Sequence, residues 1–415
     1  MSQPAHADLI IENAAELLTC RAGSADLIGL VRGGSLAVAG ERIVEVGPAH
    51  VVRKRIDRSG ARVIDASGQV VMPGFVDCHT HVVFAGSRVD EFAARLRGFD
   101  TATLAAQGLP VGIAGTAAQT RAASLDQLVE ETFARLREML DWGTTTVESK
   151  SGYGLDTDAE LRILEAGRRL DDLQPIDIVN TFLGAHAVPT GICRDDYVDR
   201  VIQEMIPRVA AEGLAAFCDV YCEDGFFTVD DTERILGAGV LHGLRPKLHL
   251  DAYTRSGAAM VAVNIGCISV DHLNFTQHDE LRAMGDAGIT AVVMPGLDLS
   301  VGHPKPASAR TMLDNGIQVA VATDMCPACW LPSMQFVIGL ACRSSGMTVA
   351  EAIRAATLNA ARAIGREDEI GSLETGKLAD IILLDLSRHE DLAYRIGRNA
   401  VATVVKRGTL VRERA

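Results

Sequence analysis

The chain has 415 residues, of which 48% are hydrophobic and 23% charged. This composition excludes a disordered protein, and no apolar run reaches the roughly 18–20 residues that cross a bilayer. The formal net charge of −14 provides no basic surface for phosphate groups, so we expect neither nucleic acid nor a membrane as a partner. Nine scattered cysteines and an N-terminus without a secretory pattern predict a reducing, cytoplasmic location.

The two ends of the chain carry β patterns. Short apolar runs separated by glycine-containing turns lie at residues 8–11, 35–38, 43–46 and 62–64. Similar runs return at residues 380–384 and 401–406. We therefore predict that residues 1–70 and 366–415 together build one small β-sandwich domain.

From residue 71 onward the pattern changes to strand-sized apolar runs, each followed by an amphipathic helical stretch. The predicted strands are 144–148, 176–182, 218–222, 247–250, 267–272, 290–294 and 318–323, and one helix is predicted over 348–363. Strands such as Val319-Ala320-Val321 are apolar without alternation, as expected where both faces of a parallel sheet are buried. The α/β class, with a (β/α)8 barrel over residues 71–365, therefore fits better than an open sheet.

The sharpest chemical signal is the run PGFVDCHTH at residues 73–81. On a strand, His79 and His81 point to the same side and can bind one ion, although two histidines at a strand end can also be merely hydrogen-bonded. His249, His272 and Asp324 each end or follow another predicted strand. Because the C-terminal strand ends form the catalytic face of a barrel, these residues predict a site for Zn²⁺ or Fe²⁺ with room for a water.

Four longer runs accompany these residues: HTHVVFAGSR at 79–88, ESKSGYGL at 148–155, TFLGAHAVP at 181–189 and VDHL at 270–273. With them, the chain resembles the metal-dependent amidohydrolase superfamily, and more narrowly its imidazolonepropionase-like branch. The resemblance implies a (β/α)8 barrel flanked by a β-sandwich, a homodimer, and hydrolysis of a small anionic ring that carries a propionate.

The resemblance also implies roles for the strand-end residues. His79, His81, His249 and Asp324 match the ligands of a divalent metal, with zinc expected first and iron or manganese also compatible. No lysine stands before Leu183 where dinuclear relatives carry a bridging lysine, so one metal is expected. The catalytic roles fall to His272, which matches a residue that hydrogen-bonds the reacting water or oxyanion, and to Asp324, which can take a proton.

Three further residues match the substrate-binding set of the branch. Arg88 and Tyr153 would hold the propionate, since a guanidinium offers a planar fork for a carboxylate, and His186 would contact the substrate. Read without the family, Arg88 could be a surface residue, Tyr153 could pack a loop, and His186 could be a hydrogen-bonded core histidine.

The sequence departs from the branch at four ring-contact positions. Ala252 replaces a glutamate that contacts the substrate ring, and Thr101 stands where the branch has a tyrosine. The loop after Asp324 carries Cys326 and Cys329 in place of polar residues, although both thiols could simply pack.

These departures favour a modified ring, because a carboxylate that pairs with a ring N–H is lost without cost only where that N–H is absent or otherwise satisfied. A 2-thioxo-5-oxoimidazolidine propionate from ergothioneine breakdown, hydrolysed with release of sulfide by a desulfhydrase reaction, is the leading hypothesis, and an N-methylated imidazolone is also compatible. The alternative is ordinary imidazolonepropionase of histidine degradation, which yields formiminoglutamate, with Asp251 or Glu223 compensating for Ala252. A remote alternative is a non-catalytic scaffold.

Overall fold

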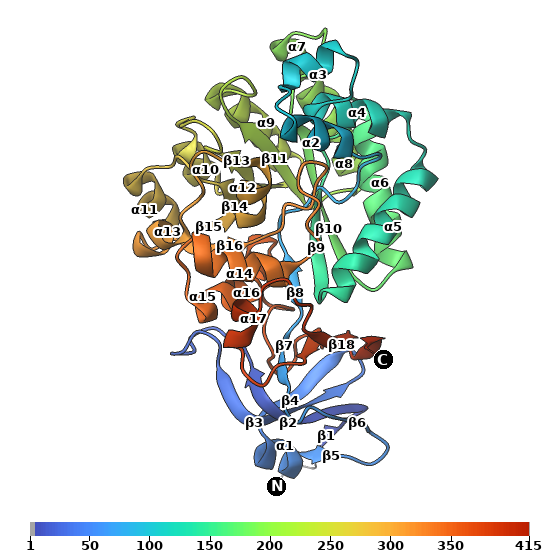
Figure 1. The fold of residues 1–415 in the computed structure, drawn as a ribbon, viewed down its shortest axis with the longest axis vertical. Coiled ribbons are helices and arrows are strands. Elements are labelled where there is room, and N and C mark those ends of the chain that lie inside the picture. Colours follow the sequence, from blue (N-terminus) through green and yellow to red (C-terminus); the bar gives the residue numbers. More distant parts are fainter. Residues whose placement is uncertain (1–4, 415) are drawn as a thin grey trace.

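The computed structural model describes residues 5–414 and contains a barrel above a mixed β-sheet (Figure 1). Eight parallel strands follow one another in chain order: β8 (Phe75–Asp77), β9 (Thr144–Lys150), β10 (Asp177–Ala185), β11 (Phe217–Cys222), β13 (Leu248–Leu250), β14 (Ser269–His272), β15 (Thr290–Val293) and β16 (Gln318–Val321). The short β12 (Arg245–Pro246) also pairs with β11. The predicted (β/α)8 barrel is confirmed.

The barrel closes where the segment after β16 meets β8. The Thr323 hydroxyl donates to Asp77 Oδ2 at 2.6 Å, and the Thr323 amide donates to Asp77 Oδ1 at 3.1 Å. Burial raises the pKa of Asp77 to about 7, although both bonds from Thr323 oppose this shift. Just beyond, the Asp324 amide donates to the His79 carbonyl at 3.1 Å. Closure therefore sets the first and last strand ends side by side.

Helices surround the barrel. Four lie between β8 and β9: α2 (Val89–Leu96), α3 (Thr101–Ala106), α4 (Gly112–Ala122) and α5 (Leu125–Asp141). The others are α6 (Thr157–Leu173), α7 (Arg194–Arg200), the π-helical η1 (Val201–Met205), α8 (Ile206–Ala211), α9 (Val229–Leu241), α10 (Ala259–Ile265), α11 (His278–Asp286), α12 (Pro295–Val301), α13 (Ala309–Asp314), α14 (Met334–Ser344), α15 (Val349–Ala355) and α16 (Leu358–Ala363). None of the helices in residues 5–414 is long and apolar enough to cross a membrane.

The single helix predicted over residues 348–363 is wrong, because α15 and α16 are separate helices. Thr357 lies between them with φ −129° and ψ −94°, outside the helical region. Its hydroxyl donates to the Ile353 carbonyl at 2.8 Å and so satisfies an end of α15. A β-branched residue with such a local bond favours a helix end.

The mixed sheet is built from both ends of the chain, as predicted. Its strands are β2 (Leu9–Leu18), β3 (Leu30–Ala39), β4 (Arg42–Pro48), β6 (Arg62–Asp65), β7 (Val70–Pro73), β17 (Ile381–Leu384), β18 (Val401–Lys406) and β19 (Thr409–Glu413). β7 pairs antiparallel with β17, and β6 pairs with β2. The remaining elements are α1 (Ala49–Arg55), α17 (Glu390–Tyr394) and the pair β1 (Ala5–His6) with β5 (Ile56–Asp57).

A buried ionic cluster joins the mixed sheet to the barrel. Asp177, the first residue of β10, lies 3.1 Å from the ammonium of Lys406 and 2.8 Å from the guanidinium of Arg366. Lys406 also contacts Asp380 at 2.6 Å. Burial would raise the pKa of Asp177, but Lys406 and Arg366 outweigh burial and hold the pKa below its usual value. The two parts are therefore fixed at the N-terminal end of the barrel strands.

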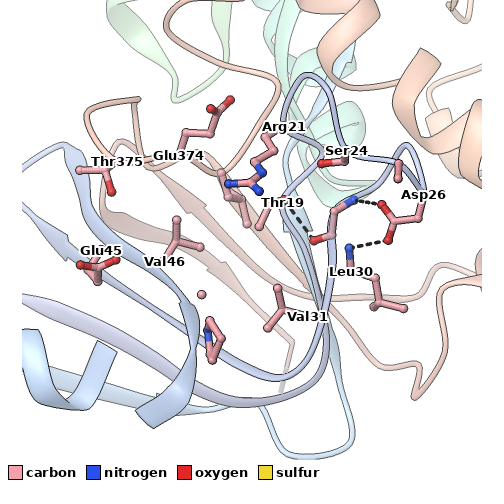
Figure 2. Close-up of a pocket in the computed structure, with 15 residues that line it drawn as sticks. Thr19, Arg21, Ser24, Asp26, Leu30, Val31, Glu45, Val46, Glu374 and Thr375 are labelled. Carbon is pink, nitrogen blue, oxygen red and sulfur yellow. Dashed lines mark hydrogen bonds between the residues drawn. The ribbon is translucent and has the colours of Figure 1, made fainter. Parts of the chain in front are cut away.

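A surface groove of about 830 Å³ lies on the mixed sheet, between β3, β4 and the loop that follows Leu373 (Figure 2). The Asp26 carboxylate in its wall accepts bonds from the amides of Gly29 and Leu30 at 2.7 and 3.0 Å. These polar groups stabilise their own loop, and none of the predicted site residues lines the groove.

We expect Thr323→Val to lower the free energy of unfolding by about 1–3 kcal/mol, because it deprives a buried carboxyl of a hydrogen bond. Thr290→Val is the matched control, since the buried Thr290 hydroxyl has no hydrogen-bond partner among residues 5–414. Urea unfolding of both variants measures the difference. Equal losses would contradict the role given to Thr323 in closing the barrel.

Candidate active site

Five predicted residues meet at the C-terminal ends of the barrel strands. His79 and His81 follow β8, His249 lies in β13, His272 ends β14, and Asp324 follows β16. The ring centroids of His79 and His249 are 4.7 Å apart, and His272 lies 5.2 Å from His249. All five are buried except His272, which is partly buried. The structure thus brings together residues that are up to 245 positions apart in the chain (79 to 324).

Two of these residues, and one near His249, have a strained backbone. His272 has φ 78° and Asp324 has φ 48°, and Asp251, two residues after His249, has φ 53°. Non-glycine residues rarely adopt positive φ, and such strain concentrates at functional sites. The strained residues therefore indicate a functional site at the ends of three barrel strands.

The Nδ1 atom of each of three histidines faces an oxygen atom. Nδ1 of His79 lies 2.9 Å from Asp271 Oδ2 in a hydrogen bond, and Nδ1 of His249 lies 3.0 Å from Asp219 Oδ2 without hydrogen-bond geometry. Nδ1 of His81 lies 3.2 Å from the carbonyl oxygen of Ser151. A carboxylate or carbonyl behind Nδ1 is typical of metal-binding histidines, because it leaves Nε2 as the ligand atom.

The atoms on the other side of the rings lack partners. His79 Nε2, His249 Nε2 and Asp324 Oδ1 are buried and make no hydrogen bond within residues 5–414. Buried polar atoms are nearly always paired, so these three atoms fit a bound ion, and imidazole with carboxylate suits zinc. Two overlapping triads, His79–His249–His272 and His79–His81–Asp324, bring their ligand atoms within 4.8 Å of one another. The cluster is a buried, histidine-rich candidate metal site.

Below the histidines lies a fully buried ammonium. Lys150 Nζ is 2.7 Å from Asp219 Oδ2, 3.0 Å from Asp271 Oδ2 and 3.1 Å from Glu148 Oε1. Lys247 Nζ lies 2.7 Å from the same Glu148 oxygen. Lys150 therefore bridges the two carboxylates that orient His79 and His249.

These charges set the protonation of the site. Burial disfavours charge on Asp271, but Lys150 and His79 outweigh it and hold the pKa of Asp271 well below its usual range. The pKa of Lys150 is raised well above its usual value, because Asp219 and Asp271 outweigh the effect of burial. Burial lowers the pKa of His79 to about 3. The imidazole of His79 is therefore neutral, as a ligand must be.

Of the three residues predicted to bind substrate, Tyr153 and His186 lie beside His81, and Arg88 is paired with Glu91. The rings of His186 and His81 stack at 4.8 Å, and Tyr153 contacts both, at 5.2 and 5.3 Å. Arg88 precedes α2, and its Nε and Nη2 atoms donate to both oxygens of Glu91 at 2.7 and 2.6 Å. Glu91 thus fixes the guanidinium and leaves Nη1 for another partner.

Neither carboxylate proposed to compensate for Ala252 is free. Glu223 accepts hydrogen bonds from the amides of Tyr253 and Thr254 at 2.9 and 2.8 Å. Asp251 accepts from Ser256 and Thr276 side chains at 2.8 and 2.7 Å. Both acids stabilise loops next to buried Ala252.

The other altered positions differ in their surroundings. The Cys326 thiol lies beside Asp324, and burial raises its pKa well above its usual value, so it is neutral. Cys329 Sγ instead lies 3.3 Å from Ser300 Oγ. Thr101 is exposed at the start of α3, and within residues 5–414 no hydrogen bond joins it to the histidines.

Sequence reasoning missed four residues of this site: Lys150, Asp219, Asp271 and Tyr221. The Tyr221 ring lies 5.9 Å from that of His249. Charged residues inside otherwise apolar strand runs were the available signal, because a buried charge needs a partner. The identity of those partners required the register between strands.

We expect Lys150→Met to weaken zinc binding by about 10- to 100-fold, since it unbalances the carboxylates that orient two ligand histidines. Lys247→Met is the control, because it removes a buried ammonium that pairs with Glu148 and not with Asp219 or Asp271. Competition with a chelator, measured on the folded fraction of each variant, gives the affinities. Equal zinc affinity in the two variants would contradict this role of Lys150.

Comparison with protein families and curated proteins gives a consistent result. Two models described as "Amidohydrolase family" match residues 62–143 and 279–411. An imidazolonepropionase of Geobacillus kaustophilus is 44% identical, with 97% of each chain covered. Those of Shouchella clausii and Haloarcula marismortui are 42% and 40% identical over 98% and 97% of this chain, and over 94% and 96% of their own lengths.

Solved structures share the fold. An adenosine deaminase from Xanthomonas campestris with bound zinc superposes with a TM-score of 0.74 at 20% identity, covering 98% of this chain and 93% of its own. A mutant atrazine chlorohydrolase of Arthrobacter aurescens, complexed with zinc and atraton, gives a TM-score of 0.71 at 20% identity, covering 98% and 95%. With its fold, its candidate metal site and these relatives, the chain belongs to the imidazolonepropionase family of amidohydrolases.

Proposed function

We propose that the protein uses one divalent metal, zinc first, to hydrolyse a five-membered imidazolone ring that carries a propionate. The observation that carries this proposal is the set of unpartnered buried ligand atoms on His79, His249 and Asp324. Relatives at 40–44% identity that are named imidazolonepropionase support imidazolone propionate as the substrate and formiminoglutamate as the product. A scaffold without a bound metal would leave these buried atoms unpaired.

The residues divide the chemistry among themselves. A divalent metal held by His79, His81, His249 and Asp324 would acidify a water molecule and would polarise the substrate bond that this water attacks. The Asp324 carboxylate can accept the proton of the attacking water through its second oxygen and pass it to the ring nitrogen as the C–N bond breaks. His272 can hydrogen-bond the oxygen that gains negative charge.

The propionate end of the substrate has its own partners. Arg88 keeps Nη1 free while Glu91 holds the rest of the guanidinium. Burial raises the pKa of Tyr153 well above its usual value, so its hydroxyl stays protonated and can donate to the carboxylate. A charged fork and a neutral donor together select for an anionic side chain.

A modified ring is the second candidate, and the surroundings of Ala252 favour it. Glu223 and Asp251 are committed to loop amides and hydroxyls, so neither offers a carboxylate to a ring N–H. The neutral Cys326 thiol lies beside Asp324 and Tyr153 and makes the surroundings of these two residues less polar. A 2-thioxo or N-methylated ring would tolerate such surroundings, and the 2-thioxo ring would lose its sulfur as sulfide.

Two wider expectations accompany the proposal. The family resemblance suggests a homodimer. A measurement of the molar mass in solution, for example by light scattering, would test this. A cytoplasmic location rests on the scattered cysteines, and fractionation of cells would test it.

Incubation of the zinc-loaded protein with imidazolone propionate, and separately with its 2-thioxo analogue, tests the two candidates. Formiminoglutamate from the first compound alone supports the ordinary reaction, and sulfide from the second alone supports a desulfurising hydrolase. Turnover of neither ring would contradict the proposed function. In the ordinary case, Ala252→Glu is expected to retain or raise activity on imidazolone propionate.

We expect Arg88→Gln to raise the KM for the propionate-bearing ring by about 10- to 100-fold, since a charged hydrogen bond of about 1.5–3 kcal/mol is lost. The kcat should change less, because the guanidinium binds the propionate, which is distant from the bond that reacts. Arg97→Gln, at an exposed position after α2, is the control. An unchanged KM in the Arg88 variant would refute the assignment of the propionate to Arg88.

A further inference from the structure

Tyr221 lies among the histidines of the site without a role in the reaction described above. It follows Asp219 by two positions on β11, so both side chains project from the same face of the strand. Its ring centroid lies 5.9 Å from that of His249, 6.1 Å from His186 and 6.3 Å from His272. The side chain therefore faces the space that these rings surround.

The Tyr221 hydroxyl makes no hydrogen bond to any of residues 5–414. The residue is only 8% exposed, yet no hydrogen bond to its hydroxyl is present within residues 5–414. By contrast, the buried Tyr197 hydroxyl donates to the Gly184 carbonyl at 2.8 Å. Tyr221 is mostly buried, but its hydroxyl is not one of the fully enclosed unpartnered atoms, so a ligand in the space between the histidines can reach it.

The hydroxyl remains a neutral donor. Burial raises the pKa of Tyr221 above its usual value, and the nearby carboxylates of Glu223 and Asp324 raise it further. The ring itself is fixed, because it packs against Phe226 with centroids 4.5 Å apart. A fixed donor can discriminate between ligands that differ in one acceptor atom.

Tyr153 and Tyr221 stand at two separate ends of the site. Both rings contact His186, at 5.2 and 6.1 Å. Tyr153 lies on the side of His81, whereas Tyr221 lies on the side of His249 and His272. If Tyr153 and Arg88 hold the propionate, the ring of the substrate reaches toward Tyr221.

We propose that Tyr221 is a specificity-determining residue that donates a hydrogen bond to an acceptor atom of the substrate ring, an oxygen, a sulfur or an unprotonated nitrogen. The inference rests on the proposed function, because it takes the ligand to be a ring with a propionate. It assigns ring recognition to a neutral hydroxyl on β11, in a site where the carboxylates of Glu223 and Asp251 are already bound to their own loops.

Tyr221→Phe tests this proposal, with Tyr253→Phe as the matched control because Tyr253 is 48% exposed. The zinc-loaded proteins are compared in kcat/KM on the ring substrate, and in their affinity for hydantoin propionate and for glutarate, which lacks a ring. We expect Tyr221→Phe to lower kcat/KM and hydantoin propionate affinity by about 10-fold or more. Glutarate affinity, zinc content and melting temperature should stay as in the wild type, because the hydroxyl has no partner in the free chain.

Each contrary result has a distinct meaning. Hydantoin propionate affinity within twofold of the wild type, or an equal loss of glutarate affinity, would overturn the role of Tyr221 while leaving the proposed function intact. Tyr221-dependent binding of hydantoin propionate without turnover of either ring would overturn the proposed reaction alone. A wild-type protein that does not bind hydantoin propionate would overturn both.

Discussion

The ammonium of Lys150, buried between three carboxylates, is the interaction on which the arrangement of the site depends. Asp219 and Asp271 share this cation, and each lies behind the Nδ1 atom of a histidine. Without it, two carboxylates at such close range in a low-dielectric interior would not both stay ionised. Because Lys150, Asp219 and Asp271 come from β9, β11 and β14, the orientation of the histidines is a property of the closed barrel rather than of its loops.

Above this charged layer, the site separates recognition from reaction. In the proposed function, Arg88 and Tyr153 supply positive charge and a neutral hydroxyl for the propionate, and the Cys326 thiol lies near both of them. Buried Ala252 adds no charge at its own position. A substrate with one anionic end and one weakly polar ring matches this division, since each mismatch would leave a buried group unpaired.

The sequence allowed the barrel, the two-ended mixed sheet and the gathering of His79, His81 and Asp324 to be predicted, because strand periodicity and strand ends are local signals. It did not reveal that Lys150 joins Asp219 to Asp271, since this requires the register of three strands. The helix over 348–363 failed at Thr357, where a side-chain hydrogen bond outweighed the helical pattern. The pairing of Arg88 with Glu91 was equally hidden, because a charged pair three residues apart also occurs on ordinary exposed helices.

The ionic cluster around Asp177 stands at one end of β10, and the loop that carries His186 begins at the other. This strand of nine residues spans about 30 Å at 3.3 Å per residue. The junction with the mixed sheet and the histidine cluster are thus separated by the length of a rigid strand. Changes at Lys406 or Arg366 therefore act on the junction between the mixed sheet and the barrel, at the opposite end of β10 from the histidine cluster.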